Sequence, residues 1–327
     1  MMSHVIIKGT GSYLPENVMS NDDLSKMVDT SDDWIRTRTG ISERRISTGE
    51  RTSDLAYEAG LRALKSANLK PDEIDLIICA TITADSFMPS CACKVQGRLG
   101  ASLAAAFDLT AACTGMIYGM VTAEQFIKTG MYSNVLVIGA ETLSGALDWE
   151  DRSTCVLFGD GASAVVLSRS DSGGGIIGSN LEADGSKKNL LTLPATTMLN
   201  PYVDKDIEDK QYKISMQGQE VFKFAVRTIT SNIDFLLNKT GLTKEDIDYI
   251  IPHQANLRII EQAAKFCKVP VDKFFMNLDR YGNTSAASIG IALDELVASG
   301  NLNPGNKIIL VGFGGGMTGG SILIEWV

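Results

Sequence analysis

A cysteine lies where a predicted strand meets a predicted helix. The short apolar run 104–109 predicts a buried strand, and from Met116 the apolar residues follow helical spacing towards a C-terminal cap at Gly130. Cys113 therefore falls in the first helical turn, where unpaired N–H groups and the positive end of the helix dipole lower the pKa of a thiol and activate it as a nucleophile. A buried structural cysteine is the alternative, and this stretch alone does not decide between them.

Two further polar residues occupy similar junctions. His253 directly follows a predicted strand at 248–251, and Asn283 precedes a predicted helix that runs to Ala298. Sites form where strand carboxyl ends meet helix N-termini, so both residues can face one cleft with Cys113. For His253 the alternative is a hydrogen-bonded structural role. Asn283 could equally cap its helix, and we expect the two roles to compete for one side chain, with Thr284 or Ser285 as substitute caps.

The glycine-rich segment 313–319 contains the spacing G-x-G-x-x-G. A dinucleotide site is rejected because that fingerprint needs a helix after the glycines, whereas a strand is predicted at 321–327. Glycines here favour a close approach of the backbone to a substrate, with N–H groups as donors, and a simple hairpin turn is the alternative.

Several cationic and aromatic residues suit a nucleotide-bearing or acidic ligand. A Trp or Arg side chain stacks on a base and Arg binds phosphate, which makes Trp34, Arg38 and Arg152 candidates. Arg258 and Lys265 are about two helical turns apart and, with Lys223, could form one basic face. Ordinary solvated surface residues are the alternative interpretation for all of them.

The predicted elements alternate between strands and helices, which indicates an α/β protein with mostly parallel sheets covered by helices. Strands are predicted at 5–8, 75–81, 134–139 and 162–168, helices at 21–28, 52–67 and 89–99, a loop at 9–15, an N-cap at Thr30 or Ser31, and a turn-rich boundary at 170–175.

The second half of the chain repeats the first. The segment 73–78 resembles 246–251 and the segment 135–139 resembles 308–312, both at one offset (248 − 75 = 173 and 312 − 139 = 173). Chance similarity of apolar strands is the alternative to duplication. We predict two α/β halves, residues 1–172 with the cysteine nucleophile and residues 173–327 with the histidine and asparagine.

Composition narrows the function classes. The 327 residues are 44% hydrophobic and 21% charged, as in a globular protein with a substantial core, and the net charge of −9 argues against nucleic-acid binding. The six cysteines form no CxxC pair and the two histidines are far apart, so no metal site is expected. We expect no signal peptide, no membrane span, and reduced thiols in a cytoplasmic protein.

Four motifs carry a family resemblance: Thr-Ala-Ala-Cys-Thr-Gly at 110–115, Pro-His-Gln-Ala-Asn-Leu-Arg at 252–258, Tyr-Gly-Asn-Thr-Ser-Ala-Ala-Ser at 281–288 and Gly-Phe-Gly-Gly-Gly at 312–316. Together they resemble β-ketoacyl-[acyl-carrier-protein] synthase III, the initiating condensing enzyme of bacterial fatty-acid synthesis and a member of the thiolase superfamily. The resemblance extends from residue 9 to the end of the chain. It implies a thiolase-like five-layer α-β-α-β-α fold of two duplicated halves and a homodimer.

The resemblance also implies an acyltransferase chemistry with Cys113, His253 and Asn283 as catalytic residues. Cys113 would take the acyl group of an acyl-CoA, with acetyl-CoA the expected donor. Malonyl-acyl-carrier-protein would then lose CO2, and the carbanion would attack the acyl-Cys to give 3-oxoacyl-carrier protein. Backbone N–H groups of Cys113 and Gly315 would form the oxyanion hole, and no metal or cofactor is implied.

The remaining assignments follow from the same resemblance. Residues implied to bind CoA are Trp34, Arg38, Arg152, Met216, Gly218, Val221, Ala255 and Asn256. Residues implied for the acyl and malonyl pocket are Met88, Leu143 and Phe313, with Met88 capping the pocket of a partner subunit. Residues implied to bind acyl carrier protein are Gln254, Ala255, Asn256, Leu257, Arg258, Lys223 and Lys265.

Specificity stays open at this stage. A large aromatic residue at Met88 would shorten the acyl pocket, Gly319 stands where relatives carry Trp, and no role is assigned to segment 196–213. A specialised enzyme that primes a polyketide or alkylquinolone pathway and a non-catalytic carrier-protein-binding paralogue are the alternatives. A thiolase proper would need a second cysteine within 313–320, and the halves do not resemble those of cysteine peptidases.

Overall fold

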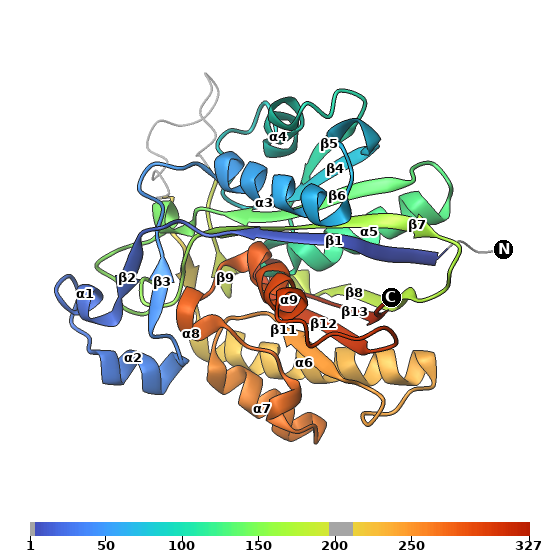
Figure 1. The fold of residues 1–327 in the computed structure, drawn as a ribbon. Helices are drawn as coiled ribbons and strands as arrows, with labels where there is room; N and C mark the ends of the chain where they lie inside the picture. Colours follow the sequence, from blue (N-terminus) through green and yellow to red (C-terminus); the bar gives the residue numbers. More distant parts are fainter. Residues whose placement is uncertain (1–3, 196–211) are drawn as a thin grey trace.

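Two β-sheets form the frame of the molecule (Figure 1). The structure is a computed structural model, and it describes residues 4–195 and 212–327. The first sheet has the order β1 (His4–Tyr13), β7 (Gly161–Ser170), β6 (Asn134–Glu141), β4 (Leu76–Ala80), β5 (Ala105–Leu109). The second has the order β11 (Tyr249–Pro252), β12 (Lys307–Gly314), β13 (Thr318–Glu325), β8 (Gly175–Ala183). Both sheets are mixed rather than mostly parallel, because β7 and β13 run antiparallel to both of their neighbours.

Helices cover both outer faces and fill the space between the sheets (Figure 1). The helices α3 (Thr52–Ala67) and α4 (Cys91–Leu99) pack on the first sheet, α5 (Gly115–Lys128) and α9 (Ser288–Ala298) lie between the sheets, and α6 (Gly218–Thr240) and α7 (Leu257–Cys267) cover the second. This is the predicted five-layer α-β-α-β-α arrangement. Alternate residues of one strand serve different layers: Ile78 packs in the central layer and Ile77 in the outer one. Strand β4 is therefore apolar and buried along its whole length.

Shorter elements connect this frame: β2 (Val18–Ser20), α1 (Asn21–Ser25), α2 (Asp32–Thr39), β3 (Glu43–Arg45), β9 (Leu191–Thr192), β10 (Ser215–Met216), α8 (Leu278–Tyr281), and the 3-10 turns η1 (Pro71–Glu73), η2 (Ala112–Thr114), η3 (Leu143–Ala146), η4 (Gly185–Lys187), η5 (Val271–Lys273), η6 (Ser285–Ala287) and η7 (Gly315–Met317). Ser31 caps α2 by accepting a hydrogen bond from the backbone N–H of Trp34, as its position predicts. No helix in the described residues has both the length and the apolar character of a membrane span.

Three local predictions are wrong. The first strand continues through the predicted loop to Tyr13, because a Cβ at Gly9 or Gly11 would clash with the backbone of α3, so these glycines permit close packing and do not mark a turn. The helix predicted at 21–28 ends at Ser25. The strand β5 is not buried: it lies at the edge of its sheet, and its residues are exposed or half-buried.

The two halves match in register as well as in sequence. Leu76 pairs with Val135, and Tyr249 pairs with Ile308, at the offset of the sequence repeat (249 − 76 = 173 and 308 − 135 = 173). Two non-glycine residues with positive φ also fall at this offset, Ala112 at 47° and Ser285 at 46° (285 − 112 = 173). Each opens a 3-10 turn that leads into a central helix. These matches support a duplication, and the division between residues 172 and 173 stays a prediction.

Candidate active site

Cys113 sits in η2, between the edge strand β5 and the central helix α5, and is buried. The hairpin that joins β12 to β13 closes over it. A Cβ at Gly314 would stand 2.8 Å from the backbone nitrogen of Cys113, so this approach is open only to glycine. The glycine-rich segment is therefore both a hairpin turn and a wall of the site, and the two sequence interpretations are compatible.

A narrow cavity of about 140 Å³ brings together the predicted catalytic residues. Cys113, His253 and Asn283 line it, together with Phe313, whose ring lies edge-on to the His253 imidazole with centroids 5.2 Å apart. Cys113 lies within the turn η2 before α5, His253 directly follows β11, and Asn283 lies just before the turn η6 that leads into α9. The residues converge because the repeated strand-to-helix junctions face each other.

The imidazole of His253 is held from behind by Ser288. Nδ1 lies 2.7 Å from the Ser288 hydroxyl, and burial lowers the pKa of His253 to about 3, so the ring is neutral near pH 7. Ser288 is the first residue of α9, and the positive end of that helix favours a lone pair on Nδ1. We therefore assign the hydroxyl as the donor to Nδ1, an assignment that leaves the proton on Nε2. Sequence reasoning missed Ser288, because 35 positions separate it from His253.

Asn283 divides its amide between two tasks. Its Oδ1 accepts a hydrogen bond of 2.8 Å from the backbone N–H of Ser285 and so stabilises the turn η6. Its Nδ2 donates to no other described residue, and Asn283 lines the cavity. The predicted competition for one side chain is therefore wrong, since Oδ1 alone caps the turn and leaves Nδ2 available for the proposed catalytic role.

The thiol pKa shifts in the direction opposite to the prediction. Burial raises the pKa of Cys113 to about 12, which outweighs the lowering by the Ser285 hydroxyl and by the backbone N–H of Cys113. The neighbouring Glu141 carboxylate raises it further. The resting residue is a thiol, so its proton must leave as the sulfur attacks.

A second, wider cavity of about 1000 Å³ is also lined by Cys113. Leu143 and Gly315 line this cavity, along with Phe87 and Phe158. Met88 is 87% exposed and is absent from the linings of these cavities within the chain. Cys113 thus stands between two compartments of different size, and Phe313 belongs to the narrow one.

The residues implied to bind CoA fall in two groups. The pantetheine candidates line the narrow cavity: Met216, Gly218, Val221, Ala255 and Asn256. The nucleotide candidates form a separate cluster, in which the guanidinium carbons of Arg38 and Arg152 lie 5.8 and 5.3 Å from the Trp34 ring centroid. Asn256 connects the groups, because its Nδ2 donates to the backbone carbonyl of Arg38.

Only some of the residues predicted to bind the carrier protein are exposed. Arg258 and Lys265 are exposed on α7, and Lys223 is exposed on α6 but ion-paired with Glu220 at 2.7 Å. Leu257 is half-buried. Gln254 is 1% exposed, and its amide bonds the backbone of Pro252, Phe275 and Asn277. The docking role predicted for Gln254 is therefore wrong, because its side-chain amide is fully engaged in hydrogen bonds that stabilise the loop after β11.

Two other sequence observations receive a structural account. A Cβ at Gly319 would lie 2.6 Å from Thr228, so glycine there lets α6 approach β13 and leaves no room for a larger residue. Segment 196–213, which had no predicted role, lies mostly outside the described residues. Within the described residues no cluster of three or more His, Cys, Asp or Glu side chains is placed to hold a metal ion.

Comparison with known proteins identifies close relatives along the whole chain. A family model described as 3-oxoacyl-[acyl-carrier-protein (ACP)] synthase III matches residues 107–185, and its C-terminal counterpart matches residues 237–326. The chain is 56% identical over 326 residues to the β-ketoacyl-[acyl-carrier-protein] synthase III of Clostridium acetobutylicum, covering 99% of both chains.

Solved structures show the same fold. The 3-oxoacyl-[acyl-carrier-protein] synthase III of Aquifex aeolicus VF5 superposes with a TM-score of 0.91 at 48% identity, covering 99% of this chain and 100% of the other. The priming β-ketosynthase from the R1128 polyketide biosynthetic pathway has the same TM-score at 34% identity, covering 99% of this chain and 96% of the other.

Proposed function

The chain belongs to the β-ketoacyl-[acyl-carrier-protein] synthase III family, the acyltransferases that initiate fatty-acid synthesis, and from this premise we propose how its own residues carry out the reaction. An acyl-CoA donates its acyl group to Cys113, and malonyl-acyl-carrier-protein condenses with it. The observation that carries the residue assignment is the single cavity lined by Cys113, His253 and Asn283.

In the first half-reaction the Cys113 sulfur attacks the thioester carbon of acyl-CoA. The S–C bond to Cys113 forms as its S–H bond breaks, the bond to CoA breaks, and the thiol proton passes to the departing CoA sulfur. Covalent catalysis suits this exchange because one thioester replaces another of similar energy. Backbone N–H groups of Cys113 and Gly315 stabilise the tetrahedral oxyanion in our proposal.

In the second half-reaction malonyl-acyl-carrier-protein loses CO2, and negative charge develops on its thioester oxygen. The His253 Nε2–H and the Asn283 Nδ2–H donate hydrogen bonds to that oxygen from a dry cavity, where such bonds are strong. A neutral histidine is suited to this task because it keeps its N–H without adding charge. Loss of CO2 supplies the carbanion, so the proposed chemistry needs neither metal nor cofactor.

Two surfaces extend the site towards its substrates. The Trp34, Arg38 and Arg152 cluster is the proposed site for the nucleotide end of CoA, with the narrow cavity for its pantetheine arm. The exposed Arg258 and Lys265, with Lys223, are proposed to dock the acidic carrier protein, despite a net charge of −9 for the whole chain. Ala255, Asn256 and Leu257 would sit where the docked pantetheine enters.

We propose that two copies of the chain form a homodimer along the exposed edge of the first sheet. β5 leaves one side of its backbone without a neighbouring strand among those described. Large apolar side chains stand exposed near it, with Phe87 at 84%, Met88 at 87% and Leu103 at 78%. A second copy would cover this edge and bring Met88 to the wide cavity of its partner. A cytoplasmic location stays a prediction from the sequence.

The first test is mass spectrometry of the protein after incubation with single acyl-CoAs, without malonyl substrate. We expect an acyl adduct on the Cys113 peptide with acetyl-CoA, and no adduct in Cys113→Ala. A panel of longer and branched acyl-CoAs distinguishes a fatty-acid initiator from a specialised priming enzyme. The specialised enzyme is the second candidate function, supported by 34% identity to the polyketide priming β-ketosynthase and by the wide cavity. Absence of any adduct would contradict acyl-CoA as the donor.

A further inference from the structure

One buried cation has no role in the steps above. Arg44 lies in the middle of β3, is 0% exposed, and forms no ion pair with any carboxylate of the described residues. Its Nε also has no partner among these residues. A buried charge without a counterion is costly, and arginine side chains ordinarily keep their charged ends in water. Neutral acceptors must therefore hold this guanidinium.

The guanidinium of Arg44 joins two distant segments of the chain. Nη1 donates to the side-chain oxygen of Asn21 at 2.8 Å and to the backbone carbonyl of Met19 at 3.2 Å. Nη2 donates to the backbone carbonyl of Val156 at 2.8 Å. Met19 belongs to β2 and Asn21 opens α1, whereas Val156 lies 112 positions after the arginine. The planar fork of arginine presents donors to all three acceptors at once.

The short segment 157–159, which follows the last of these acceptors, holds the backbone of Asn283. The N–H of Asn283 donates to the carbonyl of Leu157 at 2.8 Å, and its carbonyl accepts from the N–H of Gly159 at 3.0 Å. The residue between them, Phe158, pairs with Asn283 as in a parallel β-sheet. The position of the Asn283 backbone therefore depends on the position of this segment.

Two glycines bring the same residues against the stem of Arg44. A Cβ at Gly159 would lie 3.1 Å from the Arg44 Cβ and 2.5 Å from a backbone oxygen of α8. A Cβ at Gly282 would lie 3.5 Å from the Arg44 Cβ and 2.8 Å from the backbone oxygen of Leu157, and Gly282 has a φ of 63°. Any side chain at these positions would separate the packed segments. Arg44 is thus in contact with both neighbours of the Asn283 backbone.

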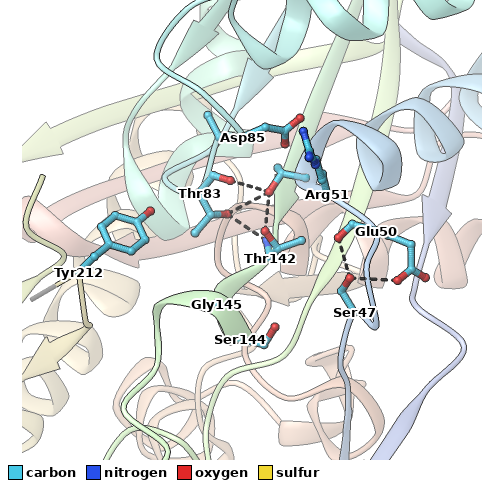
Figure 2. A pocket seen from close by; sticks show the side chains of 11 residues that line it. Ser47, Glu50, Arg51, Thr83, Asp85, Thr142, Ser144, Gly145 and Tyr212 are labelled. Atoms are coloured by element: carbon cyan, nitrogen blue, oxygen red, sulfur yellow. Dashed lines mark hydrogen bonds between the residues drawn. The ribbon is translucent and has the colours of Figure 1, made fainter. Parts of the chain in front are cut away.

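The far end of the segment is attached to the loop after β3. The backbone N–H of Asp160 donates to the carbonyl of Arg45 at 2.8 Å, and the Asp160 carboxylate accepts from the N–H of Ser47 at 2.8 Å. Figure 2 shows this loop at the edge of a polar cavity, where the Ser47 hydroxyl bonds the backbone carbonyl and the carboxylate of Glu50 at 2.6 and 3.0 Å. β3 and residues 156–160 are therefore joined at both ends.

We propose that Arg44 is a positioning residue for the condensation step: its guanidinium holds the segment that fixes the backbone of Asn283, and so directs the Asn283 amide to the narrow cavity. The inference deepens the proposed function and rests on Asn283 as a donor to the malonyl thioester oxygen. Arg44 itself lines neither cavity beside Cys113. Loss of the guanidinium lets residues 156–159 and Asn283 shift together, which slows condensation and leaves acyl transfer to Cys113 intact.

The same guanidinium links Asn283 to the proposed nucleotide site. Its acceptors on β2 and α1 belong to the unit that carries Trp34 and Arg38 on α2. Arg152 precedes the third acceptor by four residues (156 − 152 = 4). A change at Arg44 can therefore alter the KM for acyl-CoA as well, so the two half-reactions have to be measured separately.

The test is a single turnover of protein that already carries the acyl group. Cys113 is acylated with excess acetyl-CoA, the adduct is confirmed by mass, the acetyl-CoA is removed, and malonyl-acyl-carrier-protein is added. We expect Arg44→Met to form the wild-type adduct and to condense about 10- to 100-fold more slowly, since a displacement of about 1 Å costs up to about a hundredfold. Arg44→Lys keeps the charge without the fork and should lose roughly fivefold, the effect of one lost hydrogen bond.

A double-mutant cycle separates the positioning of Asn283 from a general loss of order. In the Asn283→Asp background, which lacks the N–H donor, Arg44→Met should change the condensation rate by less than about twofold. If guanidinium unfolding shows that Arg44→Met does not fold, Arg44→Lys takes its place in the cycle. Multiplied losses in the double variant, or wild-type condensation in any folded Arg44 variant, overturn the proposal.

The matched control is Asn232→Ala. Asn232 is also 0% exposed, and its amide joins α6 to β8 and β13 through Glu182 at 2.8 Å and Ser321 at 3.0 Å. None of these three residues lines a cavity beside Cys113. The control should lose stability and keep the wild-type condensation rate, and an equal slowing there overturns the inference. Absence of the acyl adduct in the wild type refutes the proposed function and the inference with it, whereas multiplied losses after normal acylation refute only the role of Arg44.

Discussion

The amide of Asn283 gives a direct way to separate structure from catalysis. Asn283→Asp keeps the oxygen that accepts from Ser285 and removes the N–H donor, whereas Asn283→Ala removes both. We expect both variants to form the acyl adduct on Cys113. Both should lose condensation by about 10²–10³-fold, the usual loss for one donor to a developing oxyanion. Condensation retained in Asn283→Asp would show that Asn283 acts only as a cap.

Ser288 sets the proton position on His253 in our account. Ser288→Ala should weaken condensation by about 1 kcal/mol, roughly fivefold, and leave Cys113 acylation unchanged. The direct measurement is nitrogen NMR of the imidazoles. The chain has two histidines, so exposed His4 is the internal reference. We expect the Nε2–H form in the wild type and a mixture of forms in Ser288→Ala. A wild-type ring protonated on Nδ1 would contradict the assignment.

His253 also makes stability depend on pH. Its pKa is about 3 in the folded chain and about 6.5 when unfolded, so the unfolded state binds more protons between these values. Stability is lost as the pH falls through the unfolded value. Relative to His253→Asn, the wild type should lose about 2 kcal/mol of unfolding free energy between pH 7.5 and 5. Guanidinium unfolding measures this, and parallel pH curves for the two proteins would refute it.

At the scale of elements, the repeat was the most informative part of the sequence. Two matched strands at one offset predicted two similar halves. The structure repeats that offset in the strand register and in the positive φ of Ala112 and Ser285. The periodicity of strands and helices was therefore sufficient to predict the fold and the positions of the three catalytic candidates, because strands and helices are recognised from local sequence pattern.

The wrong predictions share a physical cause. Burial of a residue by segments far away in the sequence cannot be recognised from the residues next to it. Gly9 looked like part of a loop because α3, which demands its small size, begins far along the chain. Gln254 looked exposed within a polar motif, yet Phe275 and Asn277 bury it. The thiol pKa was predicted from its own helix, whereas desolvation by the surrounding layers dominates.

The close packing of β6 on η6 is tested by Gly139→Ala. A Cβ at Gly139 would clash with the backbone carbonyl of Ala286, so the turn that carries Ser285 must shift. We expect a loss of about 1–3 kcal/mol in unfolding free energy and slower Cys113 acylation. Gly97→Ala is the control, because nothing lies within 4 Å of its added Cβ. Equal unfolding midpoints for both variants would contradict the packing argument.

At the scale of the whole molecule, an acidic protein is proposed to bind an acidic partner through a local basic face. Arg258→Glu should raise the KM for malonyl-acyl-carrier-protein by roughly tenfold, and the effect should shrink at high salt. Acylation by acyl-CoA should not change. Lys65→Glu is the control, since Lys65 is exposed on α3, on the opposite side of the molecule in Figure 1. An equal effect of both charge reversals would argue against a docking face on α7.

Met88 links the proposed dimer to specificity. Met88→Phe should reduce the longest acyl chain found on the Cys113 peptide, and Met88→Ala should extend it, because the residue is proposed to fill the wide cavity of the partner. Leu103→Phe, at another exposed apolar position, should leave the profile unchanged. Light scattering reports the oligomeric state of each variant. If the wild type were monomeric and had the same acyl-chain preference as the Met88 variants, the proposed contribution of the partner's Met88 to the acyl pocket would be contradicted.

The position of Cys113 between a wide and a narrow cavity has a kinetic consequence. In the proposed reaction, an acyl chain on the Cys113 sulfur would occupy the cavity of about 1000 Å³, and the departure of CoA would empty the cavity of about 140 Å³. The two substrates then use the narrow passage one after the other and never together. Turnover is expected to be ping-pong, with high acyl-CoA concentrations slowing the entry of the malonyl substrate. A lengthened product attached to its carrier would have to leave by the narrow passage before the next donor enters.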